Sequence, residues 1–129
     1  MTAENQNDSF YVKNTRIFAF TIMDNDTLDS NGQPVPLVLT DYTIQWALSQ
    51  YEATGVYNRL PVLKKDNAGI GGVVITDEDN GKVEVRLTPS DTNLDPGLYH
   101  HELELTDTSG GAVVVATGDI TLKKNIKNT

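Results

Sequence analysis

Apolar and polar residues alternate along four segments of the chain, as in strands that bury one face. Apolar side chains at every second position place the core on one side of a sheet and solvent on the other. The four segments are residues 15–23, 42–48, 82–88 and 98–106. Shorter apolar runs predict further strands at 73–76 and 112–123, and a weaker pattern predicts another at 60–65.

The inward-facing positions of these strands predict the core. They are Phe18, Phe20, Ile22, Ile44, Trp46, Leu48, Val83, Val85, Leu87, Tyr99, His101, Leu103, Leu105, Ile120 and Leu122. Trp46 is the only tryptophan and is expected at the centre. His101 has the same parity as its apolar neighbours, so we expect it to be buried and hydrogen-bonded. His100 is expected to be exposed, because adjacent strand residues point to opposite faces.

Turn residues separate the predicted strands. The Asn-Gly pair at 80–81 is typical of a tight hairpin, since both residues tolerate positive φ angles. Residues 107–111 predict a second hairpin loop, and the Asp-Pro-Gly sequence at 95–97 predicts a turn that leads into the next strand. Residues 24–36 are rich in turn formers and predict a long loop with residues 29–32 at its tip.

Two local irregularities are also expected. Gly118 interrupts the pattern of the last strand, which indicates a bulge or a bend at that residue. Residues 90–94 predict a single helical turn capped by Ser90.

About seven short strands with frequent turns predict an all-β fold, an immunoglobulin-like antiparallel β-sandwich. The 129 residues suffice for one domain. We expect the sandwich to cover residues 15–123, with a flexible N-terminal arm at 1–14 and a C-terminal tail at 124–129.

The net charge of the chain limits the classes of binding partner that we expect. It has 18 acidic and 10 basic residues, a formal net charge of −8. Nucleic acid and anionic membrane surfaces are therefore not expected as partners, because a basic patch supplies most of that affinity. The chain has no cysteine, which excludes disulfides and thiolate metal sites. The polar N-terminus has no signal-peptide pattern, and no apolar run reaches the length of a membrane span.

Few residues are placed for catalysis, and we expect no enzymatic activity and no cofactor. A Ser–His–Asp site needs His100 or His101, which point to opposite faces of one strand. The sequence contains no nucleophile elbow, phosphate-binding glycine loop or zinc-protease motif. The acidic residues at 77–79 lie in a turn, and Glu102 and Glu104 lie on the solvent face of a strand.

One loop is a candidate calcium site. Asp24, Asp26, Asp29 and Asn31 supply oxygen ligands of the kind that calcium prefers. Their spacing departs from that of the Asp-x-Asp-x-Asp-Gly loop, and Asp and Asn are also ordinary turn residues. A plain surface loop therefore stays open as the alternative.

A candidate interface lies at residues 49–60, which form a longer connection than a hairpin needs. It contains Tyr51, Tyr57 and Arg59, and Tyr and Arg are enriched at protein interfaces. A simple surface insertion is the alternative.

The order and spacing of several segments resemble a known module. They are Gly-Gln-Pro-Val-Pro-Leu at 32–37, Val-Leu-Lys-Lys at 62–65, the stretch from Asn80 to Asp107, and Val-Ala-Thr-Gly-Asp-Ile-Thr-Leu at 115–122. The chain resembles the immunoglobulin-like β-sandwich module of tailed-bacteriophage structural proteins, similar to the N-terminal domain of baseplate upper proteins. The resemblance covers residues 15–123.

The resemblance implies a non-enzymatic component of the virion, in the tail, baseplate, neck or head surface. Such a protein assembles in the bacterial cytoplasm and contacts other virion proteins or further copies of itself in a symmetric assembly. The alternative is a glycan- or receptor-binding sandwich that uses Trp46, tyrosines and a calcium ion held by residues 24–32.

Overall fold

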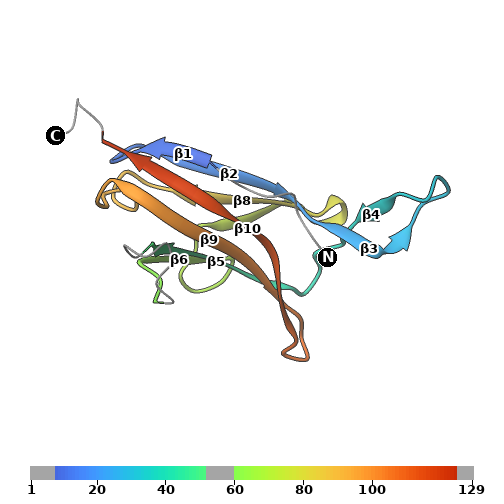
Figure 1. Cartoon of the computed structure of the whole chain (residues 1–129). Helices are drawn as coiled ribbons and strands as arrows, with labels where there is room; N and C mark the ends of the chain where they lie inside the picture. The colour runs from blue at the N-terminus through green and yellow to red at the C-terminus, as the bar shows by residue number, and fades with distance from the viewer. Residues whose placement is uncertain (1–7, 52–59, 125–129) are drawn as a thin grey trace.

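Ten strands and one short 3₁₀ helix make up the described part of the chain, residues 8–51 and 60–124 of a computed structural model (Figure 1). The strands are β1 (Asp8–Tyr11), β2 (Arg16–Thr21), β3 (Met23–Leu28), β4 (Pro34–Pro36), β5 (Thr43–Gln50), β6 (Leu63–Asp66), β7 (Val73–Asp77), β8 (Lys82–Leu87), β9 (Gly97–Thr106) and β10 (Ala112–Lys123). The 3₁₀ helix, η1, covers Glu78–Asn80. Within these ranges no helix is long and apolar enough to cross a membrane.

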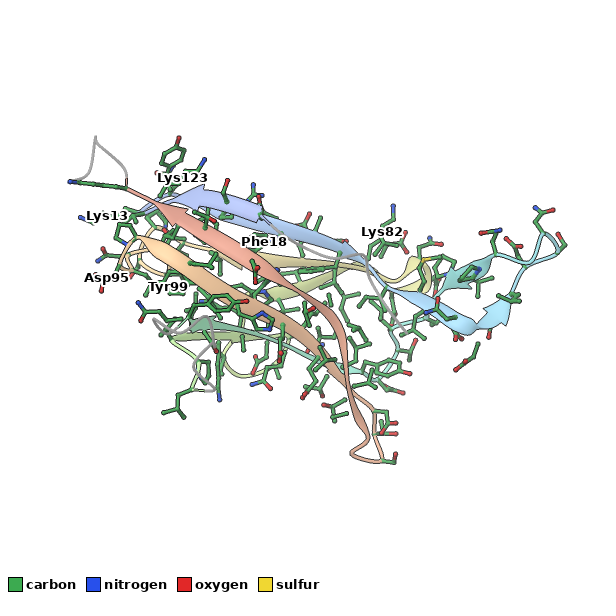
Figure 2. All side chains as sticks on the ribbon, viewed as in Figure 1. Lys13, Phe18, Lys82, Asp95, Tyr99 and Lys123 are labelled. Carbon is green, nitrogen blue, oxygen red and sulfur yellow. The ribbon has the colours of Figure 1, made fainter. Side chains whose placement is uncertain are left out.

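Eight of the ten strands form a sandwich of two sheets, and β3 and β4 form a separate two-stranded sheet. The larger sheet has the order β1-β10-β9-β5-β6 and the smaller one the order β2-β8-β7. Phe18 of β2 joins the layers, because its ring centroid lies 5.8 Å from that of Trp46 on β5 and 5.7 Å from that of His101 on β9 (Figure 2). The chain is thus an all-β, immunoglobulin-like sandwich, which confirms the predicted fold class.

The predicted core is confirmed. All its residues are buried, none with a relative exposure above 6%. Each large apolar side chain removed from water in this way contributes about 1.5–3 kcal/mol. The prediction omitted six apolar residues of the same cluster: Phe10, Leu37, Leu39, Val73, Val115 and Ala116.

The predicted N-terminal arm, residues 1–14, is wrong for residues 8–11. These form β1, which pairs in parallel with the end of β10 so that Asp8 lies opposite Ile120. Phe10 is buried there, with its ring 5.7 Å from that of Phe18. One core side chain among polar neighbours gives no alternation for a sequence pattern to detect. Residues 1–7 and 125–129, including most of the predicted tail, lie outside the described residues.

The predicted long loop at 24–36 is instead mostly a hairpin. β3 and β4 pair in antiparallel fashion, and the hairpin projects from one end of the sandwich (Figure 1). Only its tip, residues 29–33, lies outside the two strands. β3 reads Met-Asp-Asn-Asp-Thr-Leu and is exposed over its last four residues, so it lacks an apolar face. With β1, this hairpin raises the number of strands from the predicted seven or so to ten.

The predicted hairpin at 80–81 joins β7 to β8, but its turn has a different form. Asn80 ends η1, and only Gly81 has a positive φ, of 67°. The backbone N–H of Ile22 donates to the carbonyl of Gly81 at 2.9 Å. A Cβ at Gly81 would lie 2.3 Å from the backbone oxygen of Ile22, so the turn requires glycine.

The bulge in β10 lies at Val115 and not at the predicted Gly118. Val114 pairs with Glu104 and Ala116 with Leu103, which leaves Val115 as the extra residue. Gly118 pairs in regular register with His101. The bulge turns both Val115 and Ala116 towards the core, where each is at most 5% exposed.

Two further turns lie at one end of the sandwich. The helical turn after β8 begins at Thr88 rather than at the predicted Ser90. The N–H of Thr88 donates to Asp91 Oδ2 at 2.8 Å, and the N–H of Asp91 donates to Thr88 Oγ1 at 3.2 Å, the reciprocal arrangement of a capping box. The predicted turn at 95–97 leads into β9, and Tyr99 Oη donates to the carbonyl of Asp95 at 2.6 Å (Figure 2).

Candidate interaction surface

Four polar side chains meet on the outer face of the larger sheet. Tyr51 directly follows β5, His100 and Glu102 belong to β9, and Asp119 belongs to β10. Tyr51 Oη donates to Asp119 Oδ1 at 2.5 Å. His100 Nε2 lies 3.0 Å from Glu102 Oε1, and its Nδ1 lies 3.8 Å from Asp119 Oδ1. These contacts tie three adjacent strands together on the face that points away from the core.

The predicted exposure of His100 is wrong. Its side chain is 13% exposed, because the Tyr51 ring packs edge-on against it at a centroid distance of 6.1 Å and two carboxylates flank it. His100 and His101 do lie on opposite faces, as predicted, and His101 is buried. The carboxylates of Glu102 and Asp119 are 37% and 50% exposed, so both can accept hydrogen bonds from a partner.

The predicted interface at 49–60 is only partly described. Ser49 and Gln50 belong to β5, so the strand extends further than the alternation at 42–48 indicated. Tyr51 takes part in the outer-face cluster. Tyr57 and Arg59 lie outside the described residues.

The candidate calcium ligands are not brought together. Asp24 Oδ1 accepts from the N–H of Asp26, and its Oδ2 accepts from Thr27 Oγ1. At the tip, Asp29 Oδ1 accepts from the N–H groups of Asn31 and Gln33. Over residues 8–51 and 60–124, no group of three or more His, Asp or Glu side chains could hold a metal ion. Asp24 and Asp26 thus lie in β3, and Asp29 and Asn31 lie in the tip, where the carboxylates of Asp24 and Asp29 accept hydrogen bonds from their own hairpin. This arrangement favours the plain surface segment that the sequence left open as the alternative.

Three other carboxylates accept hydrogen bonds within loops, and their pKa values are lowered by the groups around them. The N–H groups of Gly71 and Ala68 lower the pKa of Asp66. The Ser109 hydroxyl and the Gly111 N–H lower the pKa of Asp107 in the β9–β10 loop. Desolvation opposes ionisation at Asp91, but the N–H of Thr88 and the Lys65 ammonium, 2.9 Å away, together lower its pKa. A lowered pKa disfavours a role as general acid or base at neutral pH.

The outer edge of β10 over residues 112–118, here called the β10 edge, presents an apolar strand. β1 pairs with β10 only from Ile120 onwards. Val113 lies opposite Leu105 and Val114 opposite Glu104, so the two valines point to different faces of the sheet. They are 41% and 44% exposed. The β9–β10 hairpin that contains them projects beyond the smaller sheet (Figure 1).

Sequence reasoning missed this surface although it predicted the strand. The detectable signal is the run Thr-Ser-Gly-Gly-Ala-Val-Val-Val-Ala-Thr-Gly at 108–118, which has no charge in a chain of net charge −8. The strand order that places this run at an edge depends on contacts between distant segments. Those contacts leave no local pattern in the sequence.

No protein-family model and no curated protein matches the chain in sequence. Among solved structures it is similar to CopC from Methylosinus trichosporium OB3b, with a TM-score of 0.42, 10% identity and coverage of 92% of this chain and 85% of that one. Murine CRIg gives a TM-score of 0.42 at 14% identity, covering 96% of this chain and 97% of that one. A family 123 glycoside hydrolase from Clostridium perfringens gives 0.40 at 10% identity, covering 94% and 23%. Similarities this distant carry no argument about activity or partner.

Proposed function

We propose that this chain is a non-enzymatic structural protein of a tailed-bacteriophage particle. It acts through protein–protein contacts in a symmetric assembly, in the tail, baseplate, neck or head surface. It assembles in the host cytoplasm, and its partners are other virion proteins and further copies of the chain. The phage context rests on the order and spacing of segments from residue 15 to residue 123.

The β10 edge is the observation that supports a role in protein–protein contact. Exposed strand edges are templates for another strand, and folded proteins commonly protect them with charges, proline or a covering segment. The β10 edge contains neither a charged residue nor a proline. Two valines more than 40% exposed lie on it. An unprotected strand edge of this kind suits a protein that binds neighbouring subunits in an assembly.

The alternative, a glycan- or receptor-binding sandwich, has less support. Trp46 has a relative exposure of 0% and is not accessible to a sugar. The hydroxyl of Tyr51 is engaged by Asp119. The carboxylates of Asp24 and Asp29 accept local hydrogen bonds in their own hairpin.

Peptide mass spectrometry on purified phage particles from the source culture tests the proposal. This chain is quantified against the major capsid and tail-tube proteins of the same particles, with the cleared lysate as the control sample. We expect a fixed copy ratio to the capsid protein that persists through density-gradient purification. A chain abundant in the lysate but lost from the particles would contradict the proposal.

A further inference from the structure

Among residues 8–51 and 60–124, no strand pairs with the β10 edge on the side away from β9. In an antiparallel pair each strand directs part of its N–H and C=O groups to one neighbour and the rest to the other side. Over residues 112–118 the described neighbour is β9 alone, since the pairing with β1 starts at Ile120. An added strand would therefore extend the larger sheet beside β10, in continuation of the position that β1 already occupies.

The side chains at this edge favour an uncharged partner strand. Val113 and Val114 point to opposite faces and are both more than 40% exposed. A strand beside them would cover one valine on each face with alternate side chains, the usual source of specificity in strand addition. An acidic strand is disfavoured here, because Glu104 and Glu102 on β9 lie opposite Val114 and Thr117.

Three other edge strands, β6, β7 and β2, are less suited to this role. β6 has only four residues, two of which are Lys64 and Lys65. None of the exposed large apolar side chains of the described residues lies on β7. β2 begins with Arg16, which forms an ion pair with Asp8. Ile17 on β2 is 47% exposed, which makes it the matched comparison for the β10 valines.

We propose that the β10 edge pairs in antiparallel fashion with the same edge of a second copy of this chain. The inference rests on the proposed function, in which copies assemble symmetrically, and it names the partner of that surface. A two-fold axis makes the contact self-complementary, with uncharged residues of one copy against uncharged residues of the other.

Charge favours a second copy at this place. Two chains of net charge −8 repel each other over most of their surfaces. The eleven uncharged residues at 108–118 are a segment where two copies can approach without like charges facing each other. Pairing of this kind would join two five-stranded sheets into one continuous sheet.

Single cysteines introduced into the full chain test the contact. The protein has no cysteine, so any disulfide in a single-cysteine variant must join two copies. Cα atoms directly opposite each other in an antiparallel pair lie about 4.5–5.5 Å apart, within the roughly 4.4–6.8 Å that a disulfide spans. The variants are Ala112→Cys, Val113→Cys, Val114→Cys and Thr117→Cys, each oxidised alone and in pairwise mixtures, with Ile17→Cys as the matched control.

We expect the dimer yield to peak at one position or one mixed pair and to fall on both sides of it. That maximum should exceed the Ile17→Cys yield by about tenfold or more, because pairing raises the local thiol concentration. A second measurement avoids cysteine. In sedimentation velocity, Val114→Lys should weaken self-association about tenfold or more, since it places two like charges in the contact. Val38→Lys, at a residue 49% exposed and outside β10, should leave it unchanged.

Three results would overturn the inference. They are equal disulfide yields from β10 and Ile17→Cys, a protein that stays monomeric at every concentration tested, and closure of a disulfide within one chain in an Asn5→Cys/Thr117→Cys variant. The last result would place residues 1–7 at the edge instead of a second copy. Particle mass spectrometry separates this inference from the proposed function. If the chain forms the dimer but is absent from the particles, only the proposed function is contradicted. If the chain is present in the particles but does not form the β10-edge contact, only this inference is contradicted.

Discussion

The indole Nε1–H of Trp46 donates a hydrogen bond to Nδ1 of His101 over 2.9 Å in the centre of the core. Both side chains are at most 1% exposed. Since Nδ1 accepts this bond, it holds no proton in the folded state. The pair satisfies two polar groups that would each be costly in an apolar interior, and it links β5 to β9 on the inward face of the larger sheet.

Replacing only one partner of this hydrogen bond leaves the other buried polar group without a partner. Replacing both partners avoids that additional loss in the free energy of unfolding. His101→Leu leaves the Trp46 N–H buried without its acceptor and should lower the free energy of unfolding by about 1–3 kcal/mol. In the Trp46→Phe/His101→Leu double variant the loss should be smaller than the sum of the single losses by about 1 kcal/mol. Urea unfolding of the four proteins measures the difference. Strictly additive losses would show that the two side chains are not coupled.

Gly81 and Gly32 give a matched pair of substitutions. Both have positive φ, 67° and 75°, so alanine at either position is expected to cost about 1–2 kcal/mol in backbone strain. At Gly81 the new Cβ would also meet the Ile22 carbonyl oxygen at 2.3 Å, whereas Gly32 has nothing within 4 Å. Gly81→Ala should therefore lower the melting temperature clearly more than Gly32→Ala. Equal losses would contradict the close approach of this turn to Ile22.

The fold should lose stability as the pH falls below about 4, through Asp66 and Asp107 among others. Backbone N–H groups around Asp66, and the Ser109 hydroxyl with backbone N–H groups around Asp107, lower both pKa values below the ordinary 3.8. A group whose pKa is lower in the folded state stabilises the fold above its unfolded pKa. That contribution is lost as the pH falls through the folded pKa.

Melting curves between pH 7 and pH 2 test this dependence. The Asp66→Asn and Asp107→Asn variants should be less stable than the parent at neutral pH and should lose less stability on acidification. Asp79→Asn is the control, because Asp79 is an exposed residue of η1 outside these loops. If both loop variants follow the parent curve at every pH, these two carboxylates do not stabilise their loops.

The fluorescence of Trp46 should be that of a buried indole and should not change when sugars or calcium are added. A side chain with 0% exposure is expected to emit at short wavelength, and its emission should stay unchanged when oligosaccharides are added. Calcium should leave the melting temperature unchanged, since a ligand stabilises only by binding the folded state. A red-shifted emission that responds to sugar, or a calcium-dependent melting temperature, would revive the glycan-binding alternative.

Alternation predicted the core well because burial of one face leaves a period of two in the sequence. Ile44, Trp46 and Leu48 on β5 are each 0% exposed, and each was predicted from that pattern alone. His101 follows the same parity and is buried for the same reason. Residues that are buried on both faces of a strand, or whose surroundings are fixed by a neighbouring strand, leave no such local pattern.

The features that escaped prediction depend on tertiary pairing. β3 forms because β4 pairs with it, although its own sequence is nearly all polar. The bulge lies at Val115, since the register with β9 shifts there, while Gly118 stays regular. His100 is covered by Tyr51, a residue distant in the chain, and so its environment cannot be inferred from its parity.

The central claim, that this sandwich acts through contacts made by the β10 edge in an assembly, is tested most directly by amide hydrogen exchange. Exchange of residues 112–118 is compared between the isolated chain at low concentration and the same chain in purified particles, with β8 as the internal reference. We predict that these amides exchange at least about tenfold more slowly in the particle, because added strand hydrogen bonds protect them. Equal exchange in the two states, with β8 unchanged, would contradict the claim.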